Sequence, residues 1–316
     1  MKILITELIW EEGIRELKEE GHTLYYDEHL WRDRDALVTA IPEYDALIVR
    51  NQTKVDKELL EAAPDLKVIG RLGVGLDNID IEFAKVRNIP VVFAKNANAT
   101  SVAEYVFSAM LASRRFLYLA HEDIKNGGWN RKQFTGNELF NKTLGLIGLG
   151  EISHRVAKRA IAFGMKVVGY DPFVTEFDHV VSETGVTNYS TVGEVIKEAD
   201  FISLHVPLTP ATHHLIGLPE LTQMKQSVCI INSSRGGIID EIALANALSA
   251  NSNMSAVLDV LEEEPISLSH PLLQQNNIML TPHVAGLTDE SQVRTSYLVA
   301  KEINKVLKGK SSLCTV

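Results

Sequence analysis

The sequence predicts an α/β protein with two doubly wound parallel sheets. Short apolar runs rich in Val and Ile alternate with helical patterns, and such alternation indicates right-handed βαβ units with parallel strands. The runs form two series, separated by an uninterrupted helical pattern over residues 98–120. A further helical stretch, about 288–308, follows the last apolar run, so two sheets account for all the predicted strands.

The first series fills the N-terminal hundred residues. Helical patterns near 11–20, 33–40, 56–62 and 81–87 separate its strands. The strands are predicted at KILI (2–5), TLYY (23–26), ALIV (46–49), KVIG (67–70) and PVVF (90–93).

The second series begins at TLGLIGLG (143–150) and supplies a second sheet. Its other strands are predicted in KVVGYD (166–171), FISLHVP (201–207), CIINSS (229–234), AVLDV (256–260) and IMLTPH (278–283). Because the helix after residue 287 has no strand series left to join, we expect it to pack back on the first sheet. The predicted organisation is therefore a discontinuous domain, 1–97 plus 288–316, with a domain inserted at 98–287.

The composition excludes some classes of function. The 316 residues are 45% hydrophobic and carry a formal charge of −10 without any basic block, which argues against a nucleic-acid partner. The N-terminal residues MKILITELIW are predicted to form a strand, not a signal peptide, and no apolar run is long enough to span a membrane.

The chain has two cysteines, Cys229 in an apolar run and Cys314 near the end. Neither fits zinc-ligand spacing, a disulfide framework or a prenylation box. We therefore expect no metal ion and a location in the reducing cytoplasm.

The stretch LIGLGEIS (146–153) places a glycine-rich turn between a strand and a helix. Gly148 permits the tight turn, and Gly150 lets the backbone approach a pyrophosphate at the helix N-terminus. Ser153 occupies the third small position, where Gly or Ala is usual. Glu151 is unusual because it places an anion beside the expected phosphates, where it either weakens binding or points to solvent.

The next predicted strand ends in Tyr170-Asp171, 21 residues after Gly150. A carboxylate there would accept hydrogen bonds from both ribose hydroxyls and would repel a 2′-phosphate, which favours NAD over NADP. The alternative is that Asp171 is a turn or N-cap residue before Pro172. The strand, turn, helix and acid together predict a dinucleotide-binding Rossmann domain.

Six long motifs lie in order along the chain. They are GRLGVGLDNID (70–80), NATSVAEY (98–105), KTLGLIGLGEIS (142–153), INSSRGGIID (231–240), LDVLEEEP (258–265) and TPHVAG (281–286). Together they resemble the motifs of the NAD-dependent D-isomer-specific 2-hydroxyacid dehydrogenases, with the 3-phosphoglycerate dehydrogenase branch nearest. The resemblance covers nearly the whole chain and implies a flavodoxin-like substrate domain beside the Rossmann domain.

Arg235 and His283 are the predicted catalytic residues at strand ends. The Arg235 guanidinium would hold a substrate carboxylate bidentately and stabilise the charge that develops on the adjacent carbonyl oxygen. The His283 imidazole would exchange the proton of the hydroxyl group. The alternatives are a surface ion pair for Arg235 and a core histidine for His283. His213 and His214 are expected to lie in a polar loop.

The three glutamates of LDVLEEEP separate by role. The resemblance implies that Glu264 bonds His283, which fixes its tautomer and favours the imidazolium. Glu262 and Glu263 match no functional position and are predicted to be solvated. Asp259 matches an acid that lies near the nicotinamide in the family, with a structural role as the alternative.

The resemblance implies further cofactor contacts, beside Gly148, Gly150 and Asp171. These are Glu151 and Ile152 at the pyrophosphate, Val206 and Pro207, Ser233, Ser234 and Arg235, Asp259, and His283, Val284, Ala285 and Gly286.

For the substrate, Val74 and Gly75 resemble the backbone loop that holds the carboxylate. Arg50, Arg71 and Arg131 resemble the phosphate-handling arginines of phosphoglycerate dehydrogenases. An ion-paired surface role is the alternative for Arg50 and Arg71.

The expected activity is NAD-dependent oxidation of a small 2-hydroxy acid, foremost 3-phosphoglycerate, in a homodimer. The alternatives are 3-sulfolactate, glycerate or hydroxypyruvate, glyoxylate and lactate as substrates, or a dinucleotide-gated corepressor-type binding protein. Because the chain stops about 30 residues after His283, regulatory C-terminal domains, and feedback through them, are not expected.

Overall fold

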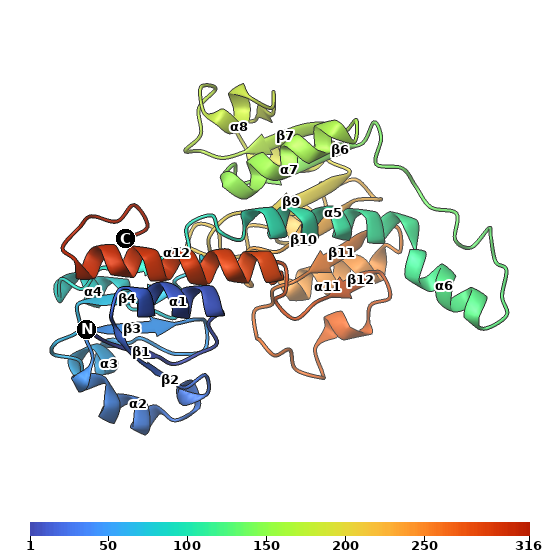
Figure 1. Cartoon of the computed structure of the whole chain (residues 1–316). Helices are drawn as coiled ribbons and strands as arrows, with labels where there is room; N and C mark the ends of the chain where they lie inside the picture. Colours follow the sequence, from blue (N-terminus) through green and yellow to red (C-terminus); the bar gives the residue numbers. More distant parts are fainter. The chain divides into compact units, whose positions relative to one another are not determined.

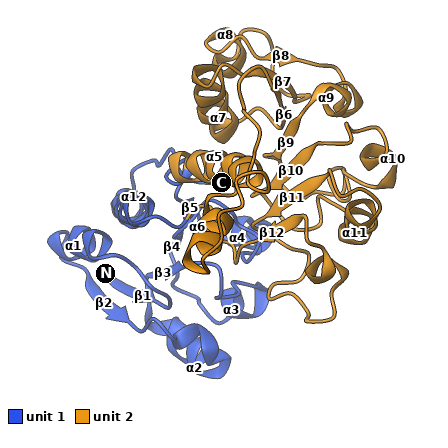
Figure 2. Cartoon of the chain, turned by 90° about the vertical axis from the view of Figure 1, so that its right-hand side faces the viewer, with its two compact units in different colours: residues 1–98, 287–316 blue, residues 99–286 orange.

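A computed structural model describes all 316 residues (Figure 1). The chain forms two compact units, one of Met1–Asn98 with Leu287–Val316 and one of Ala99–Gly286 (Figure 2). Each unit contains one sheet, and every pairing between neighbouring strands is parallel. The predicted fold class is therefore confirmed.

The sheet of unit 1 has the strand order β2-β1-β3-β4-β5, which is the flavodoxin-like order. Its central strand β3 is buried along its whole length, as expected for a parallel sheet covered on both faces. The strands are β1 (Lys2–Ile5), β2 (Thr23–Tyr26), β3 (Ala46–Val49), β4 (Val68–Arg71) and β5 (Val91–Phe93).

The C-terminal helix α12 (Asp289–Leu307) belongs to unit 1 and packs on α1, as expected (Figure 1). Its buried side chains, among them Val299 and Ile303, join the core of the N-terminal sheet. The remaining helices of this unit are α1 (Glu11–Glu19), α2 (Arg34–Ala40), α3 (Lys57–Glu61), α4 (Ile81–Val86) and the short 3-10 helices η1 (Leu30–Arg32) and η2 (Ile41–Glu43).

The sheet of unit 2 has the order β12-β11-β10-β9-β6-β7-β8. Read from β8, this is the Rossmann order 3-2-1-4-5-6 with a seventh strand added. The two-residue strand β8 was not predicted, because it is too short to give a hydrophobic pattern. The strands are β6 (Thr143–Ile147), β7 (Lys166–Tyr170), β8 (Thr187–Asn188), β9 (Phe201–Leu204), β10 (Cys229–Asn232), β11 (Ser255–Leu258) and β12 (Ile278–Leu280).

The helices of unit 2 cover both faces of this sheet, and their buried side chains contribute to two hydrophobic clusters. They are α5 (Ala99–Arg115), α6 (Leu117–Lys125), α7 (Glu151–Ala162), α8 (His179–Ser182), α9 (Val192–Glu198), α10 (Leu218–Leu221), α11 (Glu241–Ala250) and the 3-10 helix η3 (Pro271–Gln274). None of the helices in either unit combines the length and apolar character that a membrane crossing requires.

The prediction of one uninterrupted helix over residues 98–120 was wrong. Phe116 has a left-handed φ of 49°, so the helix breaks between α5 and α6. The apolar pattern continues across the break, but burial does not. Helix α5 buries residues as far as Met110, whereas α6 has no buried residue and lies apart from the sheet of its unit (Figure 1).

Substitution of Ile303 by Ala tests the contribution of α12 to unit 1. The side chain is fully buried, so its loss is expected to lower the free energy of unfolding by about 2–5 kcal/mol. The control is Lys301→Ala on the exposed side of the same helix, with an expected change of about 0.5 kcal/mol or less. Urea unfolding followed by circular dichroism measures both; equal effects would show that α12 does not anchor the unit.

Candidate functional site

The predicted glycine-rich loop joins β6 to α7. Gly148 has φ +88°, and a Cβ at this position would lie 2.5 Å from the carbonyl oxygen of His205. A Cβ at Gly150, in contrast, would meet no atom within 4 Å, so the space above it is open. Ser153 is fully buried and its hydroxyl donates to the Gly148 carbonyl at 2.6 Å. Serine at the third position therefore closes the turn by a hydrogen bond.

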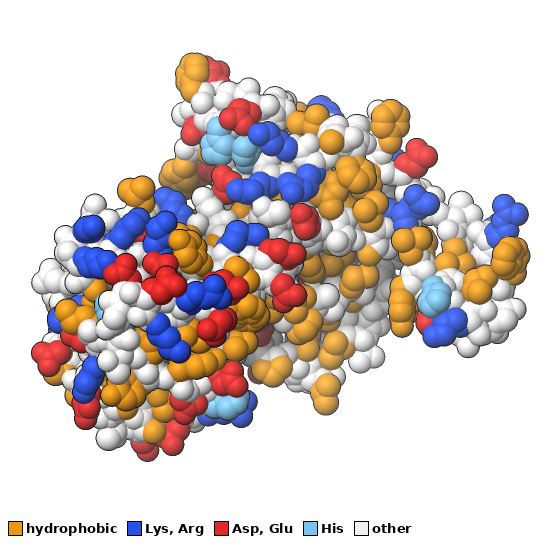
Figure 3. Space-filling view, viewed as in Figure 1, with side chains coloured by type: hydrophobic (Ala, Val, Ile, Leu, Met, Phe, Trp, Pro, Cys, Tyr) orange, Lys and Arg blue, Asp and Glu red, His pale blue; other side chains and the backbone are white.

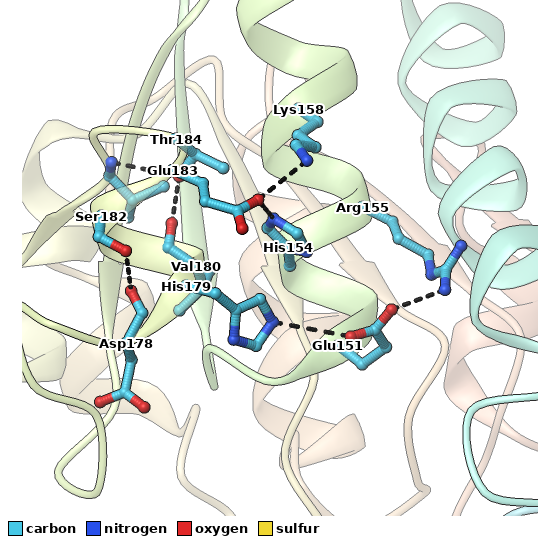
Figure 4. A network of polar contacts seen from close by, with 11 residues as sticks. Glu151, His154, Arg155, Lys158, Asp178, His179, Val180, Ser182, Glu183 and Thr184 are labelled. Carbon is cyan, nitrogen blue, oxygen red and sulfur yellow. Dashed lines mark hydrogen bonds and ion pairs between the residues drawn. The ribbon is translucent and has the colours of Figure 1, made fainter.

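The N-terminus of α7 is suited to an anion. The backbone N–H groups of Glu151 and Ile152 donate to no acceptor within the protein. Glu151 itself points neither to solvent nor over the loop. Its Oε1 pairs with Arg155 at 2.6 Å, and its Oε2 lies 3.7 Å from Nε2 of His179 (Figure 4). The predicted repulsion of phosphates is thus reduced by the Arg155 guanidinium.

Asp171 follows β7 and supports the glycine-rich loop. Its Oδ2 accepts the N–H of Leu149 at 2.8 Å, and its Oδ1 accepts the N–H of Phe173 at 2.9 Å. The turn role that the sequence left open is therefore present. The carboxylate is only partly buried, and each oxygen keeps acceptor capacity for a ribose hydroxyl.

The ends of β9 and β10 supply the other predicted cofactor contacts of this sheet. Val206 and Pro207 follow β9 by two and three residues. Ser233 directly follows β10, and its hydroxyl is buried without a hydrogen-bond partner. A buried donor of this kind is satisfied when a ligand occupies the site. The open space at Gly150, the α7 N-terminus and Ser233 together fit a dinucleotide.

Arg235 lies in the turn after β10. Asn232, which is buried, accepts hydrogen bonds from the N–H and hydroxyl of Ser234 and donates to the Arg235 carbonyl at 2.8 Å. Arg235 Nη1 donates to the Ser234 carbonyl at 2.6 Å. A Cβ at Gly236 would lie 1.9 Å from the Leu261 carbonyl oxygen. Only glycine therefore allows the Arg235 turn to contact the loop that carries Glu264.

His283 and Glu264 form the predicted pair. The Nδ1 of His283 is 2.9 Å from Oε2 of Glu264, while Glu264 Oε1 accepts the N–H of Leu261 at 3.1 Å. Because a carboxylate only accepts, the hydrogen bond places a proton on Nδ1 and directs the other nitrogen, Nε2, away from Glu264. Both side chains are about half exposed, so a substrate can reach the ring.

Asp259 holds the His283 loop from beneath. Its side chain is 1% exposed, and it accepts hydrogen bonds from the Thr281 hydroxyl and from the N–H groups of Val284 and Ala285 at 2.6–2.8 Å. The N–H of His283 donates to the Asp259 carbonyl at 2.9 Å. His283 has a left-handed φ of 57°, an unfavourable conformation for histidine, and these bonds fix it.

The sequence did not reveal the residues that support these loops. Tyr105 donates a hydrogen bond to the Thr281 hydroxyl at 2.6 Å, because the Thr281 proton is given to Asp259. Burial raises the pKa of Tyr105 to about 12, so the phenol is neutral. Glu241 accepts the N–H of Glu262 at 2.7 Å and lies 3.3 Å from His270. The only signal was the position of Tyr105 inside the motif NATSVAEY.

The sequence also did not reveal the role of His205, whose carbonyl group packs closely against Gly148. Burial lowers the pKa of His205 to about 4, so the ring is neutral at pH 7. Its Nε2 lies 2.9 Å from the Ser203 hydroxyl. Such a histidine has a structural role, unlike the exposed His283.

Glu262 and His214 form a contact separate from the His283–Glu264 pair. Glu263 is exposed, as predicted, and Glu262 is exposed but lies 3.0 Å from Nε2 of His214. The rings of His213 and His214 are stacked with centroids 3.9 Å apart.

Unit 1 brings together four of the five predicted substrate residues. Val49 and Arg71 are register partners in β3 and β4, so Arg50 and Arg71 lie at the same edge of the sheet. The N–H groups of Val74 and Gly75 have no acceptor within the protein and are available to an anion.

Arg50 is partly buried and forms no ion pair with a carboxylate. Its Nη2 donates to Gln292 at 2.8 Å, and burial lowers the pKa of its guanidinium. The buried Glu7 accepts backbone N–H groups of the loop after β3, including that of Arg50 at 2.8 Å. Glu7 was not predicted from the sequence.

Arg131 is the predicted substrate residue that belongs to the other unit. It lies in unit 2 on the exposed loop after α6, and its N–H donates to the Trp129 carbonyl at 3.1 Å. Its place in a substrate site stays a prediction.

Comparison with known proteins identifies the family of the chain. Residues 107–285, more than half of the chain, match the NAD binding domain of the D-isomer specific 2-hydroxyacid dehydrogenases. The chain belongs to this family.

Family relatives match over nearly the whole chain. A D-3-phosphoglycerate dehydrogenase of Methanocaldococcus jannaschii is 45% identical over 98% of this chain and 58% of its own length. A hydroxypyruvate reductase of Thermotoga maritima is 44% identical over 97% of this chain and 98% of its own length. The chain thus spans 58% of the first relative and almost all of the second.

Among solved structures, a D-lactate dehydrogenase from Aquifex aeolicus, complexed with NAD and lactic acid, superposes with a TM-score of 0.84. It is 30% identical, and the match covers 97% of this chain and 96% of that chain. The chain therefore shares the fold of this D-lactate dehydrogenase in both units and contains an NAD-binding domain, as predicted.

Substitution of Asp259 by Ala tests whether this carboxylate fixes the His283 loop. The change leaves two N–H groups of the loop without their acceptor, so we expect a loss of about 3–5 kcal/mol in the free energy of unfolding. Amide hydrogen exchange at Val284 and Ala285 is expected to accelerate. The control is Glu263→Ala, an exposed acid of a nearby loop. Unchanged exchange in Asp259→Ala would contradict the assignment.

Proposed function

We propose that this chain is an NAD-dependent dehydrogenase that interconverts 3-phosphoglycerate and 3-phosphohydroxypyruvate. The observation that carries the reaction class is the His283–Glu264 pair at 2.9 Å, in the loops beside the Arg235 turn. These loops follow the neighbouring strands β10, β11 and β12. They therefore lie at the carboxyl ends of the strands, where ligands of doubly wound folds bind.

Arg235 binds and orients the substrate. A guanidinium can hold the carboxylate with two parallel hydrogen bonds, and its charge stabilises negative charge on the carbonyl oxygen. Two bonds through Asn232 and Ser234 hold the turn, so the guanidinium is positioned before substrate arrives. This preorganisation is the property that electrostatic catalysis requires.

His283 moves the proton. During oxidation its Nε2 accepts the proton of the substrate hydroxyl, and during reduction it returns that proton to the oxygen. Glu264 keeps the Nδ1 proton in place and compensates the positive charge that the ring gains. NAD, held in the site formed by the glycine-rich loop and Asp171, would supply the hydride chemistry of the reaction.

The Gly148–Ile152 loop, Asp171 and Ser233 form the proposed cofactor site, with Val206, Pro207 and residues 283–286. Asp171 is an anion at the position where a 2′-phosphate would lie, which supports NAD over NADP. Asp259 contributes by fixing the His283 loop, since both of its carboxylate oxygens already accept hydrogen bonds from that loop.

The substrate assignment rests on Arg50 and Arg71 at one sheet edge, with the free N–H groups of Val74 and Gly75. The Arg50 side chain donates to an amide and not to a carboxylate, so its guanidinium remains suited to a phosphate. The D-3-phosphoglycerate dehydrogenase relative supports this substrate, and the hydroxypyruvate reductase relative supports the second candidate, hydroxypyruvate.

The proposed assembly is a homodimer that forms through unit 2. Exposed apolar side chains gather on α6 and the segment after it, where no core of the same chain covers them (Figure 3). They are Leu117, Tyr118, Leu119, Ile124 and Trp129. The two free thiols, Cys229 and Cys314, support a reducing, cytoplasmic location.

Initial rates with a substrate panel test the proposed activity. The panel contains 3-phosphoglycerate, 3-sulfolactate, glycerate and lactate, each with NAD and with NADP. We expect the highest kcat/KM with 3-phosphoglycerate and NAD. In Arg71→Ser this preference over glycerate is expected to fall about ten-fold or more, whereas Arg15→Ser, an exposed arginine on α1, keeps it. No turnover of any acid would favour the corepressor-type alternative.

Neighbouring glutamates provide a matched test of the proton-transfer role. His283→Ala is expected to lower kcat by about 10²–10⁴-fold, and Glu264→Gln by about 10–100-fold. Glu262→Gln, two residues away, is expected to be near wild type. Arg235→Lys is expected to lose about 10²–10³-fold because lysine lacks the bidentate geometry.

Binding of NADH, measured by fluorescence, is expected to persist in all four variants. Wild-type turnover in both His283→Ala and Arg235→Lys would refute the assigned roles.

A further inference from the structure

A cluster of two histidines and two glutamates lies between α7 and α8 of unit 2 (Figure 4). Glu151 and His154 are three residues apart on the first turn of α7. His179 begins α8, and Glu183 directly follows it. The rings of His154 and His179 are nearly perpendicular, at 83°, with centroids 4.5 Å apart.

The two histidines pair crosswise with the two glutamates: His154 with Glu183, and His179 with Glu151. His154 Nε2 lies 3.1 Å from Glu183 Oε2, and His179 Nε2 lies 3.7 Å from Glu151 Oε2. One ring nitrogen of each histidine and a carboxylate oxygen of Glu151 thus lie within 4.8 Å of one another. Two helices therefore present imidazole and carboxylate groups to a common centre.

The Glu151 carboxylate is fixed from its other side. Arg155 Nη2 holds Oε1 at 2.6 Å, while Arg155 Nη1 donates to the Thr100 hydroxyl on α5 at 2.9 Å. This leaves Oε2 directed at His179. A carboxylate with one oxygen on a guanidinium and the other toward a second site has the outer-shell support that metal-binding carboxylates need.

We propose that Glu151, His154 and His179 bind one Zn²⁺ ion. Two imidazole nitrogens and one carboxylate oxygen are a zinc ligand set, with ligand atoms about 3.3 Å apart in a tetrahedral site. The Glu151–His179 separation of 3.7 Å needs only a small contraction. The fourth position falls to water or to Glu183, whose Oε2 also accepts from Lys158 at 3.0 Å.

The chemical type of the ligand atoms favours Zn²⁺, and the exposure of the side chains allows an ion to enter. Mg²⁺ and Ca²⁺ prefer oxygen ligands, whereas two imidazoles favour Zn²⁺ and its transition-metal neighbours. His179 is 51% exposed and Glu183 is 52% exposed, so an ion can enter and the side chains can adjust. His154 is 12% exposed, so its ring is already held near the metal-binding orientation.

The zinc site adjoins the predicted cofactor site through one residue. Glu151 is the first residue of α7, whose N-terminus is the proposed pyrophosphate site. His154 and His179 belong to no part of the proposed dehydrogenase site. The proposal therefore does not depend on the proposed function.

Isothermal titration of the metal-free chain with ZnCl₂, without dinucleotide, tests the proposal. Wild type is expected to bind one Zn²⁺ per chain. His179→Ala and His154→Gln are each expected to weaken binding by about ten-fold or more. The matched control is His121→Ala, an exposed histidine on α6, which is expected to bind as wild type does.

A folding defect is distinguished by thermal denaturation without metal. Because His179 is half exposed, its alanine variant is expected to melt within a few degrees of wild type. Absence of zinc binding by wild type would overturn the proposal and leave the cluster as cross-helix ion pairs. Equal affinity in wild type and both histidine variants would also overturn it, because the ion would then bind elsewhere.

Co²⁺ provides a second readout. A bound Co²⁺ ion is expected to give visible absorption that His179→Ala abolishes. Absorption that persists in both histidine variants would contradict the assigned ligands.

Discussion

The conformation of the predicted catalytic loops depends on the hydrogen bonds that the buried carboxylate of Asp259 accepts. Asp259 lies one residue past β11 and accepts hydrogen bonds from the loop after β12, so it joins the ends of two strands. His283 occupies an unfavourable left-handed conformation that isolated backbone would leave. The hydrogen bonds to Asp259 therefore hold His283 in the orientation in which its Nδ1 bonds Glu264.

A second constraint is the absence of a side chain at Gly236. The Arg235 turn and the Glu264 loop approach so closely there that a Cβ would overlap the Leu261 carbonyl. Arg235, Glu264 and His283 come from three different loops, yet Gly236 and Asp259 join these loops by short contacts. The site is therefore built by the backbone as much as by the charged residues.

The strands were predictable because parallel strands buried on both faces read as apolar runs. The predicted runs at 2–5 and 46–49 coincide with β1 and β3, whose residues are almost all buried. The break at Phe116 was not predictable, since the apolar pattern continues through it and only burial stops. Periodicity shows which face is apolar, but it does not show what covers that face.

The candidate site shows the same division. The motifs placed Arg235 and His283 at strand ends and implied that Glu264 bonds His283, and the structure shows this hydrogen bond. Glu241 gave no signal and Tyr105 gave none beyond its place in a motif, because a buried polar partner is defined by three-dimensional contacts. Glu151 illustrates the limit: its sequence position suggested an isolated anion, whereas it pairs with Arg155 and lies near His179.

The half-buried Arg50 carries a further consequence for the life of the protein. Burial of a cation without a paired carboxylate costs folding free energy, which its lowered pKa reflects. An anionic ligand that binds only the folded chain would offset that cost by mass action. The abundance of folded protein in a cell would then follow the concentration of the metabolite, so supply of substrate would protect the chain from proteolysis.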